Sequence, residues 1–272
     1  MPFTLSHPAA VLPFLAGARA RGPLVASALI AGSMAPDLPF FADSLVRGAY
    51  RQGALAHRWW AVPTVDVALA GVLVAGWHGL LREPLVALLP ERWAGAAEAM
   101  TARGGAGPRL ERAGWFAVSA AVGAATHVGW DGFTHGGRYG VALLPVLDAR
   151  VAGLPLYTVL QYGSSAVALG YLARYTAREA RGAVPAPALA LSPGARRAGT
   201  AVLGAATVAG VAHRLARRER GLIAELCFGA GAGLAVGAVG YAAAVRLLAG
   251  RRAVHPAARA ATTAAQRRRA TA

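Results

Sequence analysis

The stretch GLIAELCFGAGAGLAVGAVGYAAAVRLL, residues 221 to 248, is longer than the roughly 20 apolar residues that a helix needs to cross a bilayer. It is rich in alanine and glycine, which make a span weakly hydrophobic but let neighbouring helices approach closely. Four other segments are similar in composition and cover residues 61 to 81, 113 to 130, 154 to 173 and 198 to 212. Together they predict an all-α fold, a multi-pass membrane helix bundle.

The composition supports this prediction. Of the 272 residues, 56% are hydrophobic and 15% are charged, and the mean hydropathy is +0.44. Ordinary soluble domains carry about 25% charged residues. We therefore expect the lipid bilayer as a partner, with about four to six membrane-embedded helices. We expect no β-sheet, because isolated strands cannot satisfy their backbone groups in lipid.

The charge of the chain is strongly positive, with a formal net value of +16, and all 28 basic residues are arginine. An amino-acid composition rich in alanine, glycine and arginine indicates a bacterial genome rich in G and C. Clusters at residues 174 to 182, 213 to 220 and 251 to 272 flank apolar segments, as expected for anchoring to anionic lipid. We therefore expect a bacterial cytoplasmic membrane location. Nucleic-acid binding is disfavoured, because no stacking aromatics are interleaved with these arginines.

The organisation predicted along the chain has four parts. Residues 1 to 175 form a helical domain that carries the candidate metal site. Residues 176 to 197 contain several prolines and arginines and are predicted to be a linker. Residues 198 to 250 form a C-terminal helix pair, and residues 251 to 272 a disordered basic tail. The oligomeric state does not follow from these patterns.

The motif ATHVGWDGFTHGG, residues 125 to 137, places three polar side chains at intervals of four. His127 and Asp131 would lie on one face of a helix, as metal ligands require. The glycines at 132, 136 and 137 favour a helix end before His135, which is then a group behind the ligands or a ligand itself. The alternative is an ordinary ion pair between His127 and Asp131, with His135 in a turn.

Three more polar residues lie in distinctive motifs of the N-terminal part: His7 in TLSHP, Asp37 in GSMAPDLPFF and His57 in ALAHRWW. Each has a simpler interpretation as a capping, turn or headgroup-level residue. Taken together they favour a site, because ionisable groups buried near a membrane are costly. Cys227 is the single cysteine, so any metal must use imidazole and carboxylate. Zinc is the divalent ion expected to accept both.

The motifs MPFTLSHPAAVLPF, GSMAPDLPFF, AHRWW, THVGWDGFTHGG and LYTVLQYGSS, in this order, resemble the bacterial multi-pass domain-of-unknown-function family 4184 over roughly residues 1 to 170. They are more distantly similar to membrane-bound metal-dependent hydrolases and to the zinc-dependent phospholipase C fold. The resemblance implies metal-site roles for five residues: His7, Asp37, His57, His127 and Asp131. It implies no established substrate.

The reaction that this chemistry favours is metal-assisted hydrolysis, and the membrane suggests a lipid phosphoester as substrate. Arg58 and Arg138, beside the motifs, are expected to hold a phosphate or to lie at headgroup level. No catalytic side chain can be assigned. The alternative is a non-catalytic membrane protein whose histidines and aspartates form a structural metal site or a polar network joining helices. A transporter is a third interpretation, weakened by the few charges inside the apolar segments.

Overall fold

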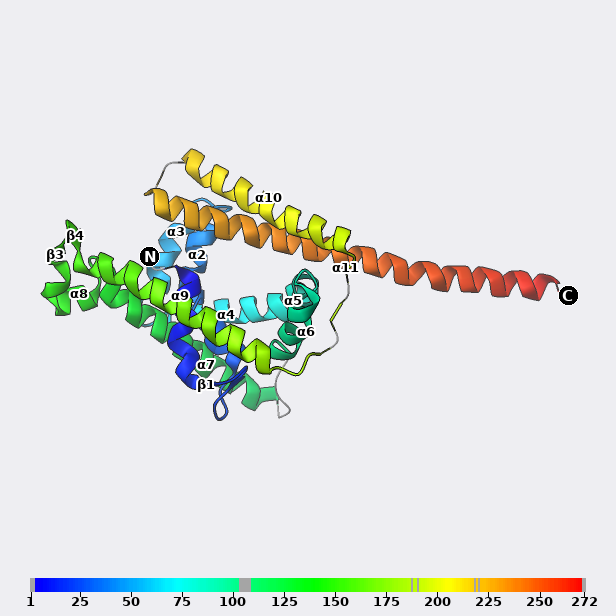
Figure 1. The fold of residues 1–272 in the computed structure, drawn as a ribbon, viewed down its shortest axis with the longest axis horizontal. Helices are drawn as coiled ribbons and strands as arrows, with labels where there is room; N and C mark the ends of the chain where they lie inside the picture. The colour runs from blue at the N-terminus through cyan, green and yellow to red at the C-terminus, as the bar shows by residue number, and fades with distance from the viewer. Residues whose placement is uncertain are drawn as a thin grey trace.

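Helices make up most of the protein, as predicted (Figure 1). The computed structural model describes residues 3–102, 109–186, 188–189, 191–217, 219 and 221–270. The α-helices are α1 (Ala26–Gly32), α2 (Leu38–Ala42), α3 (Tyr50–Ala56), α4 (Val65–Gly76), α5 (Arg82–Val86), α6 (Glu91–Met100), α7 (Arg109–Thr134), α8 (Tyr139–Leu143), α9 (Leu156–Gly182), α10 (Pro193–Arg217) and α11 (Leu222–Ala270). Three 3-10 segments and one π-helical turn connect them: η1 (Thr4–Phe14), η2 (Ala35–Asp37), η3 (Trp77–Leu81) and η4 (Pro145–Asp148).

The prediction was of no β-sheet, which a sheet of three or more strands would contradict, and no sheet of that size occurs among the described residues. Two antiparallel hairpins occur, β1 (Leu15–Ala16) with β2 (Arg19–Ala20) and β3 (Arg150–Val151) with β4 (Leu154–Pro155). Each strand has only two residues, and the turns carry glycines with positive φ, Gly17 at 66° and Gly153 at 83°. Glycine adopts this conformation at little steric cost. The hairpins are therefore turns between helices and add no layer to the fold.

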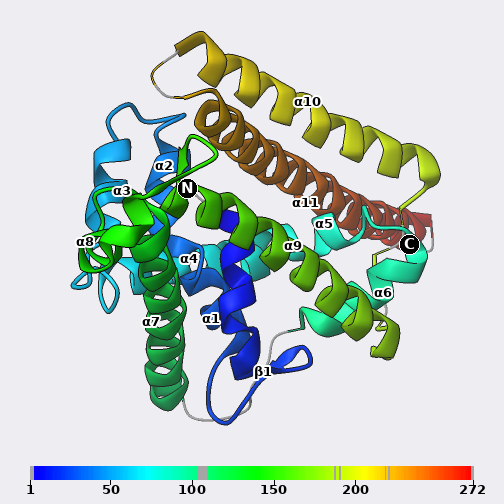
Figure 2. The same ribbon diagram turned by 60° about the vertical axis from the view of Figure 1, so that its left-hand side comes forward.

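The centre of the protein is built around η1 and α1, which pack against α7, α4 and α9 (Figure 2). Two glycines bring the α1 and α7 backbones together. A Cβ atom on Gly32 would overlap the carbonyl of Ala120, and one on Gly123 would overlap the carbonyl of Leu29 and lie 2.8 Å from the Ser33 nitrogen. Only glycine permits such backbone contact. The close approach brings the end of α1 against the part of α7 that carries His127.

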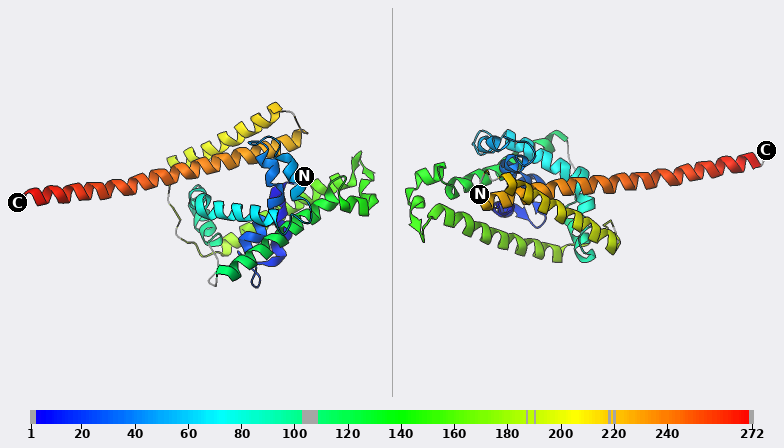
Figure 3. Two further views of the ribbon diagram at one scale, coloured as in Figure 1. Left: turned by 180° about the vertical axis from the view of Figure 1, so that it is seen from behind. Right: turned by 90° about the horizontal axis from the view of Figure 1, so that it is seen from above.

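The C-terminal helices α10 and α11 form an antiparallel hairpin on one side of the molecule, and α11 continues well beyond it (Figure 3). Gly229 and Gly233 of α11 lie one turn apart and face Gly210 and Ala206 of α10. Small residues at this spacing let two helices pack backbone to backbone. The helix α11 runs through Ala270, across most of the segment for which the sequence predicted a disordered tail.

This packing predicts opposite effects for two glycine substitutions in α11. Gly233→Ala should lower thermal stability, because its Cβ would overlap the carbonyl of Ala206. The cost should be about 1–3 kcal/mol, as for other overpacked sites. Gly240→Ala is the matched control, because nothing lies within 4 Å of a Cβ at that position. It should stabilise the helix by up to about 1 kcal/mol. Thermal melting in detergent measures both, and equal shifts would contradict the packing.

A buried ion-pair cluster joins the hairpin to the rest of the protein. Arg214 of α10 is fully buried, and its Nε atom donates to Glu225 at 2.7 Å while Nη1 donates to Asp43 at 2.9 Å. Arg217 also donates to the backbone carbonyl of Asp43, at 2.6 Å. The guanidinium of Arg214 lies 5.5 Å from the ring centre of Phe228. Asp43 follows α2, so the cluster ties α10 and α11 to the segment that carries part of the candidate site.

Two segments of the described chain are long and apolar enough to cross a membrane: Val65–Val86 and Leu222–Leu248. Within their most apolar windows, 11% and 33% of the residues are buried inside the protein. The first matches the expected span at 61 to 81 and includes the π-helical turn η3. The other expected spans are helical but are not among these two. Their alanine and glycine content keeps them weakly hydrophobic.

Candidate metal centre

Five polar side chains meet in the interior at the junction of η1, η2, α3 and α7. They are His7 of η1, Asp37 at the end of η2, His57 directly after α3, and His127 and Asp131 of α7. All are buried, with exposed fractions between 0% and 5%. Candidate ligand atoms of Asp37, His57, His127 and Asp131 all lie within 4.8 Å of one another. This four-residue group, two aspartates and two histidines, could hold a metal ion.

Backbone carbonyls orient the two histidines of this group. His127 Nδ1 lies 2.7 Å from the Ser33 carbonyl, and His57 Nδ1 lies 2.7 Å from the Gly53 carbonyl. A carbonyl can only accept, so each Nδ1 carries the hydrogen, and in the neutral ring each Nε2 bears a lone pair. Hydrogen bonds of this kind orient metal-binding imidazoles in proteins.

The two Nε2 atoms face each other at a distance of 3.2 Å. Both also lie 3.5 Å from Asp37 Oδ1, and they lie 3.3 and 3.6 Å from Asp131 Oδ2. Four electron-rich atoms therefore converge in a buried space. Such an arrangement needs a cation, either a proton on one imidazole or a metal ion.

The carboxylates are held in place unequally. Asp37 Oδ2 accepts a hydrogen bond of 2.6 Å from the Thr4 hydroxyl, which leaves Oδ1 directed at the imidazoles and without a hydrogen-bond donor. Asp131 Oδ1 likewise has no hydrogen-bond partner. Since unpartnered buried oxygens are costly, both atoms are suited to a cation. Thr4 was not anticipated as part of the site, although it belongs to the same TLSHP motif as His7.

His7 lies beside the four-residue group. Its ring stacks on that of His127, with centroids 3.6 Å apart and an interplanar angle of 16°. Its Nε2 lies 3.6 Å from Asp131 Oδ1, and neither ring nitrogen has a hydrogen-bond partner. The edge of the Trp130 ring covers it from another side, at a centroid distance of 5.8 Å. The structure thus brings His7 to the site but against a different oxygen of Asp131.

His135 follows the last residue of α7, Thr134, so the helix ends before it, as predicted. Its Nδ1 lies 3.2 Å from the Asp131 backbone carbonyl and 3.5 Å from Asp131 Oδ1, and the Gln161 amide donates to its Nε2 at 3.2 Å. Its side chain is 18% exposed, against 2% for Asp131. His135 therefore occupies the outer edge of the site. Gln161 was not anticipated, although it lies in the LYTVLQYGSS motif.

The titratable groups of the cluster differ in how strongly they hold a proton. All of them lie outside the two candidate membrane spans. Burial by itself lowers the pKa of His127, but the Asp37 and Asp131 carboxylates outweigh it and raise this pKa to about 10. Burial and the nearby His127 charge lower the pKa of His7 to about 3. Burial raises the pKa of Asp131, but hydrogen bonding to His127 and His57 dominates and leaves the pKa well below its ordinary value. Without metal, a proton on His127 offsets one of the two negative charges of Asp37 and Asp131.

These pKa values predict a pH-dependent metal affinity. The pKa of His127 is raised from 6.5 to about 10, so its proton stabilises the metal-free protein below pH 6.5, and this stabilisation is lost as the pH rises through about 10. An ion that takes Nε2 must displace this proton. The affinity should therefore rise about tenfold per pH unit from near neutrality to about pH 10. Calorimetric titration with Zn²⁺ in buffers of different ionisation enthalpy measures the release; zero protons released at pH 8 would contradict it.

The arginines expected to bind substrate lie at the periphery. Arg58 follows His57 directly and is exposed, and Arg138 directly precedes α8, three residues after His135. The charge of Arg138 contributes to a lowered pKa of His135, about 4, for which burial is the main cause. Arg138 is thus within electrostatic range of the outer edge of the site.

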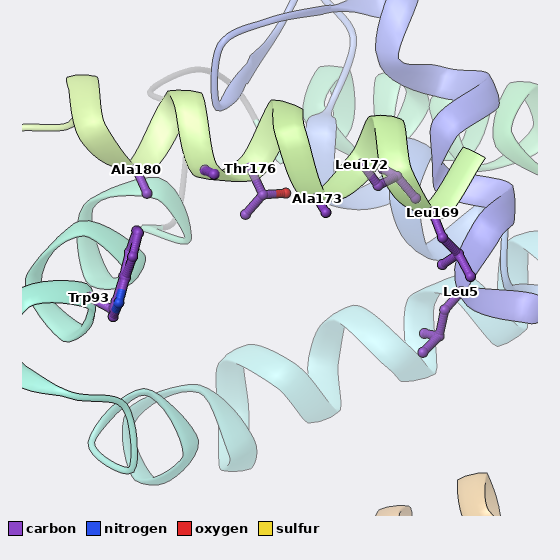
Figure 4. A pocket seen from close by; sticks show the side chains of 8 residues that line it. Leu5, Trp93, Leu169, Leu172, Ala173, Thr176 and Ala180 are labelled. Atoms are coloured by element: carbon purple, nitrogen blue, oxygen red, sulfur yellow. The ribbon is translucent and has the colours of Figure 1, made fainter. Parts of the chain in front are cut away.

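An open apolar groove of about 450 Å³ lies between η1, α6 and α9 (Figure 4). Leu5 and Leu169 line one end of it, and Trp93 and Ala180 the other. Thr176 is the single polar side chain in this lining. Leu5 is two residues from His7 on the same η1 segment.

Comparison with known families gives one match. The model of a family described as "Domain of unknown function (DUF4184)" matches residues 1–243, which is most of the chain. No curated protein and no solved structure matches the chain. The distant similarity to membrane-bound hydrolases and to the phospholipase C fold remains an interpretation of the motifs.

Proposed function

Because the chain belongs to the DUF4184 family, whose description names no activity, we propose a function from the site itself: an integral-membrane, metal-dependent hydrolase of lipid phosphoesters. The metal site is supported by one observation: the His57 and His127 Nε2 atoms lie 3.2 Å apart, while both Nδ1 atoms are hydrogen-bonded to backbone carbonyls. Two nitrogens and two carboxylate oxygens suit zinc.

The residues of the chain have defined roles in this proposal. Asp37, His57, His127 and Asp131 hold the ion, and Thr4 and two backbone carbonyls keep three of them oriented. A divalent ion bound there lowers the pKa of a coordinated water and polarises a phosphoryl oxygen. His135, at the exposed edge, marks the side from which substrate and water enter. Arg138 is positioned to attract a phosphate to that side.

The lipid substrate and the multi-pass membrane location are supported by surface features. The segments Val65–Val86 and Leu222–Leu248 are long and apolar, and only 11% and 33% of their most apolar windows are buried, which favours contact with lipid. The groove between η1 and α9 has the volume and apolar lining suited to a hydrocarbon chain. A water-soluble phosphoester has no hydrocarbon chain that could occupy such a groove.

A second function is favoured by the burial of the ligands. With exposed fractions of 5% or less, the four-residue group resembles a closed site that joins η2, α3 and α7. In that case the ion is structural, and the protein is a non-catalytic membrane protein.

Hydrolysis assays distinguish the two functions. The full-length protein in detergent or lipid nanodiscs is stripped with chelator, reloaded with Zn²⁺, and incubated with vesicles of defined phospholipids. Metal-dependent release of a phosphorylated headgroup or of phosphate is expected, with loss in Asp37→Asn. Zinc that binds and raises the melting temperature without any turnover would support the structural site, and no bound metal would contradict both.

A further inference from the structure

The two apolar segments Val65–Val86 and Leu222–Leu248 both begin beside the candidate metal centre. The first begins shortly after His57 in the chain. In the second, the Phe228 ring lies 5.8 Å from the ring of Phe40, which in turn lies 5.4 Å from the ring of His57. The helix α8 and the hairpin of β3 and β4 lie at this end of the molecule as well, which is called the site end (Figure 1).

The two segments also end side by side. Arg246 of α11 donates to the Leu80 carbonyl at 3.2 Å, and it lies 3.5 Å from the Glu83 carboxylate. The segments are therefore parallel. If both cross a bilayer, both enter it on the face that carries the metal centre and leave it on the other face.

The arginines that flank these segments in the sequence give no orientation. Residues 45 to 64 and 202 to 221, before the segments, contain three and four arginines. Residues 87 to 106 and 249 to 268, after the segments, contain two and five. Cytoplasmic loops carry an excess of arginine and lysine within about 15–20 residues of a span. Because the two sides are equal, this rule does not decide which of them is cytoplasmic.

The tertiary structure removes part of the positive charge from the site end. Arg214 is fully buried against the carboxylates of Asp43 and Glu225. Arg217 is 7% exposed and contacts the carboxylates of Asp43 and Glu219. Both guanidinium groups are therefore matched by acids of the protein itself. They contribute little to the attraction of the site end for an anionic surface.

The opposite end gains positive charge from the connection between α9 and α10. This connection lies beside α5, α6 and α11 (Figure 2). The Ala186 nitrogen donates to the Gly95 carbonyl of α6 at 3.0 Å. A Cβ atom on Gly199 of α10 would lie 2.6 Å from Leu88 and 2.8 Å from Tyr241 of α11. The connection therefore lies where the two apolar segments end.

This end of the molecule, called the basic end, carries eleven arginines in two stretches. Residues 174 to 197 contain five arginines and a single acid, Glu179. The five are Arg174, Arg178, Arg181, Arg196 and Arg197, and all except the half-buried Arg196 are exposed. Residues 249 to 272 contain six more arginines and no acid. The excess of positive charge at the basic end is thus produced by the packing of α9 and α10.

We propose that the basic end binds the anionic phospholipid headgroups of the cytoplasmic leaflet, and that the candidate metal centre opens on the external face of the membrane. Basic segments beside a span are attracted to the anionic lipids of that leaflet. This inference rests on the membrane location in the proposed function and adds its sidedness. The phosphoesters that reach the exposed edge of the site, at His135, are then those of the outer leaflet.

Single cysteines at the two ends test this orientation. Cys227→Ser gives a full-length chain without cysteine, to which Ala149→Cys or Ala195→Cys adds one thiol. Both alanines are exposed; Ala149 directly precedes β3 at the site end, and Ala195 lies in the first turn of α10 at the basic end. A membrane-impermeant maleimide is added to intact and to permeabilised spheroplasts of a bacterial expression host. Ala149→Cys should be labelled equally in both, and Ala195→Cys only after permeabilisation.

The other labelling patterns contradict the proposal in different ways. The reverse pattern would overturn the orientation and leave the proposed hydrolase intact. Labelling of both cysteines in intact spheroplasts, or of neither, would place the two ends on one face of the membrane. That result would overturn the orientation and also the crossing of the membrane by the two segments, while the hydrolysis assay still tests the metal centre separately.

Neutralising the basic end tests the cause of the orientation. With glutamine at all eleven arginines, Ala195→Cys should become labelled in part before permeabilisation, because the attraction to the cytoplasmic leaflet is lost. Arg47→Gln with Arg51→Gln is the matched control at the site end, where both arginines are exposed, and it should leave the labelling unchanged. Unchanged labelling in the neutralised variant would overturn the role of the basic end. If that variant does not fold, the labelling of the two single cysteines decides.

Discussion

Alanine at His127 or at Asp131 is expected to abolish stoichiometric metal binding. His127 supplies the Nε2 atom that lies within 3.6 Å of His57, Asp37 and Asp131, and Asp131 contacts every imidazole of the cluster. Without His127, the buried carboxylates of Asp37 and Asp131 lose an imidazole between them. Without Asp131, the buried imidazoles of His57 and His127 lose a carboxylate. Metal content per chain, measured after dialysis of the purified protein, should fall from stoichiometric to background. Circular dichroism establishes that each variant is still helical.

The variant His135→Ala tests whether His135 binds the metal itself or only supports a ligand. Because His135 contacts Asp131 without joining the four-residue group, its loss should weaken metal binding only about 10- to 100-fold. His213, exposed on α10, is the control, and His213→Ala should leave the affinity unchanged. Complete loss in His135→Ala would make His135 a ligand. Unchanged metal content in the His127, Asp131 and His135 variants would mean that His127 and Asp131 form only an ordinary ion pair.

Arg214→Ala is expected to cost about 3–5 kcal/mol of stability, the largest effect outside the metal centre. The substitution leaves the Glu225 carboxylate without the guanidinium that binds it, and leaves the Asp43 carboxylate with the longer contact to Arg217, at 3.3 Å. Both carboxylates are 2% exposed. It also removes the contact with Phe228. Because the cluster joins α10 and α11 to the segment after α2, the hairpin should detach at a lower temperature or denaturant concentration. Thermal melting in detergent with a fluorescence readout measures this loss.

Arg246→Ala is the matched control for this prediction. Arg246 forms an exposed ion pair with Glu83 at 3.5 Å, and such pairs contribute about 0–1 kcal/mol. The triple variant Arg214→Met, Asp43→Asn, Glu225→Gln should recover much of the lost stability, because no uncompensated charge stays buried. A loss in Arg214→Ala no larger than that in Arg246→Ala would show that the buried cluster contributes little.

The all-α class of the fold and the residue types of the candidate site followed from the sequence. The length and composition of apolar segments are local properties, and they predicted helices where α4, α7, α9, α10 and α11 lie. The rarity of histidine and aspartate in an apolar chain singled out the polar residues that meet in the interior. The glycines after Asp131 located the end of α7 before His135. Family membership, expected from the order of the motifs, is confirmed over residues 1–243.

The tertiary structure decided how these residues are combined. Thr4, the Ser33 carbonyl and the Gly53 carbonyl orient Asp37, His127 and His57, and nothing in their residue types announces this role. The pairing of Arg214 with Asp43 spans 171 positions and gives no local signal. Such contacts depend on how closely helices approach, as where Gly32 and Gly123 bring α1 against α7. Local sequence patterns predict a helix and the polar residues that it carries. The direction of an imidazole lone pair, and the contact of the two Asp131 oxygens with different imidazoles, result only from tertiary packing.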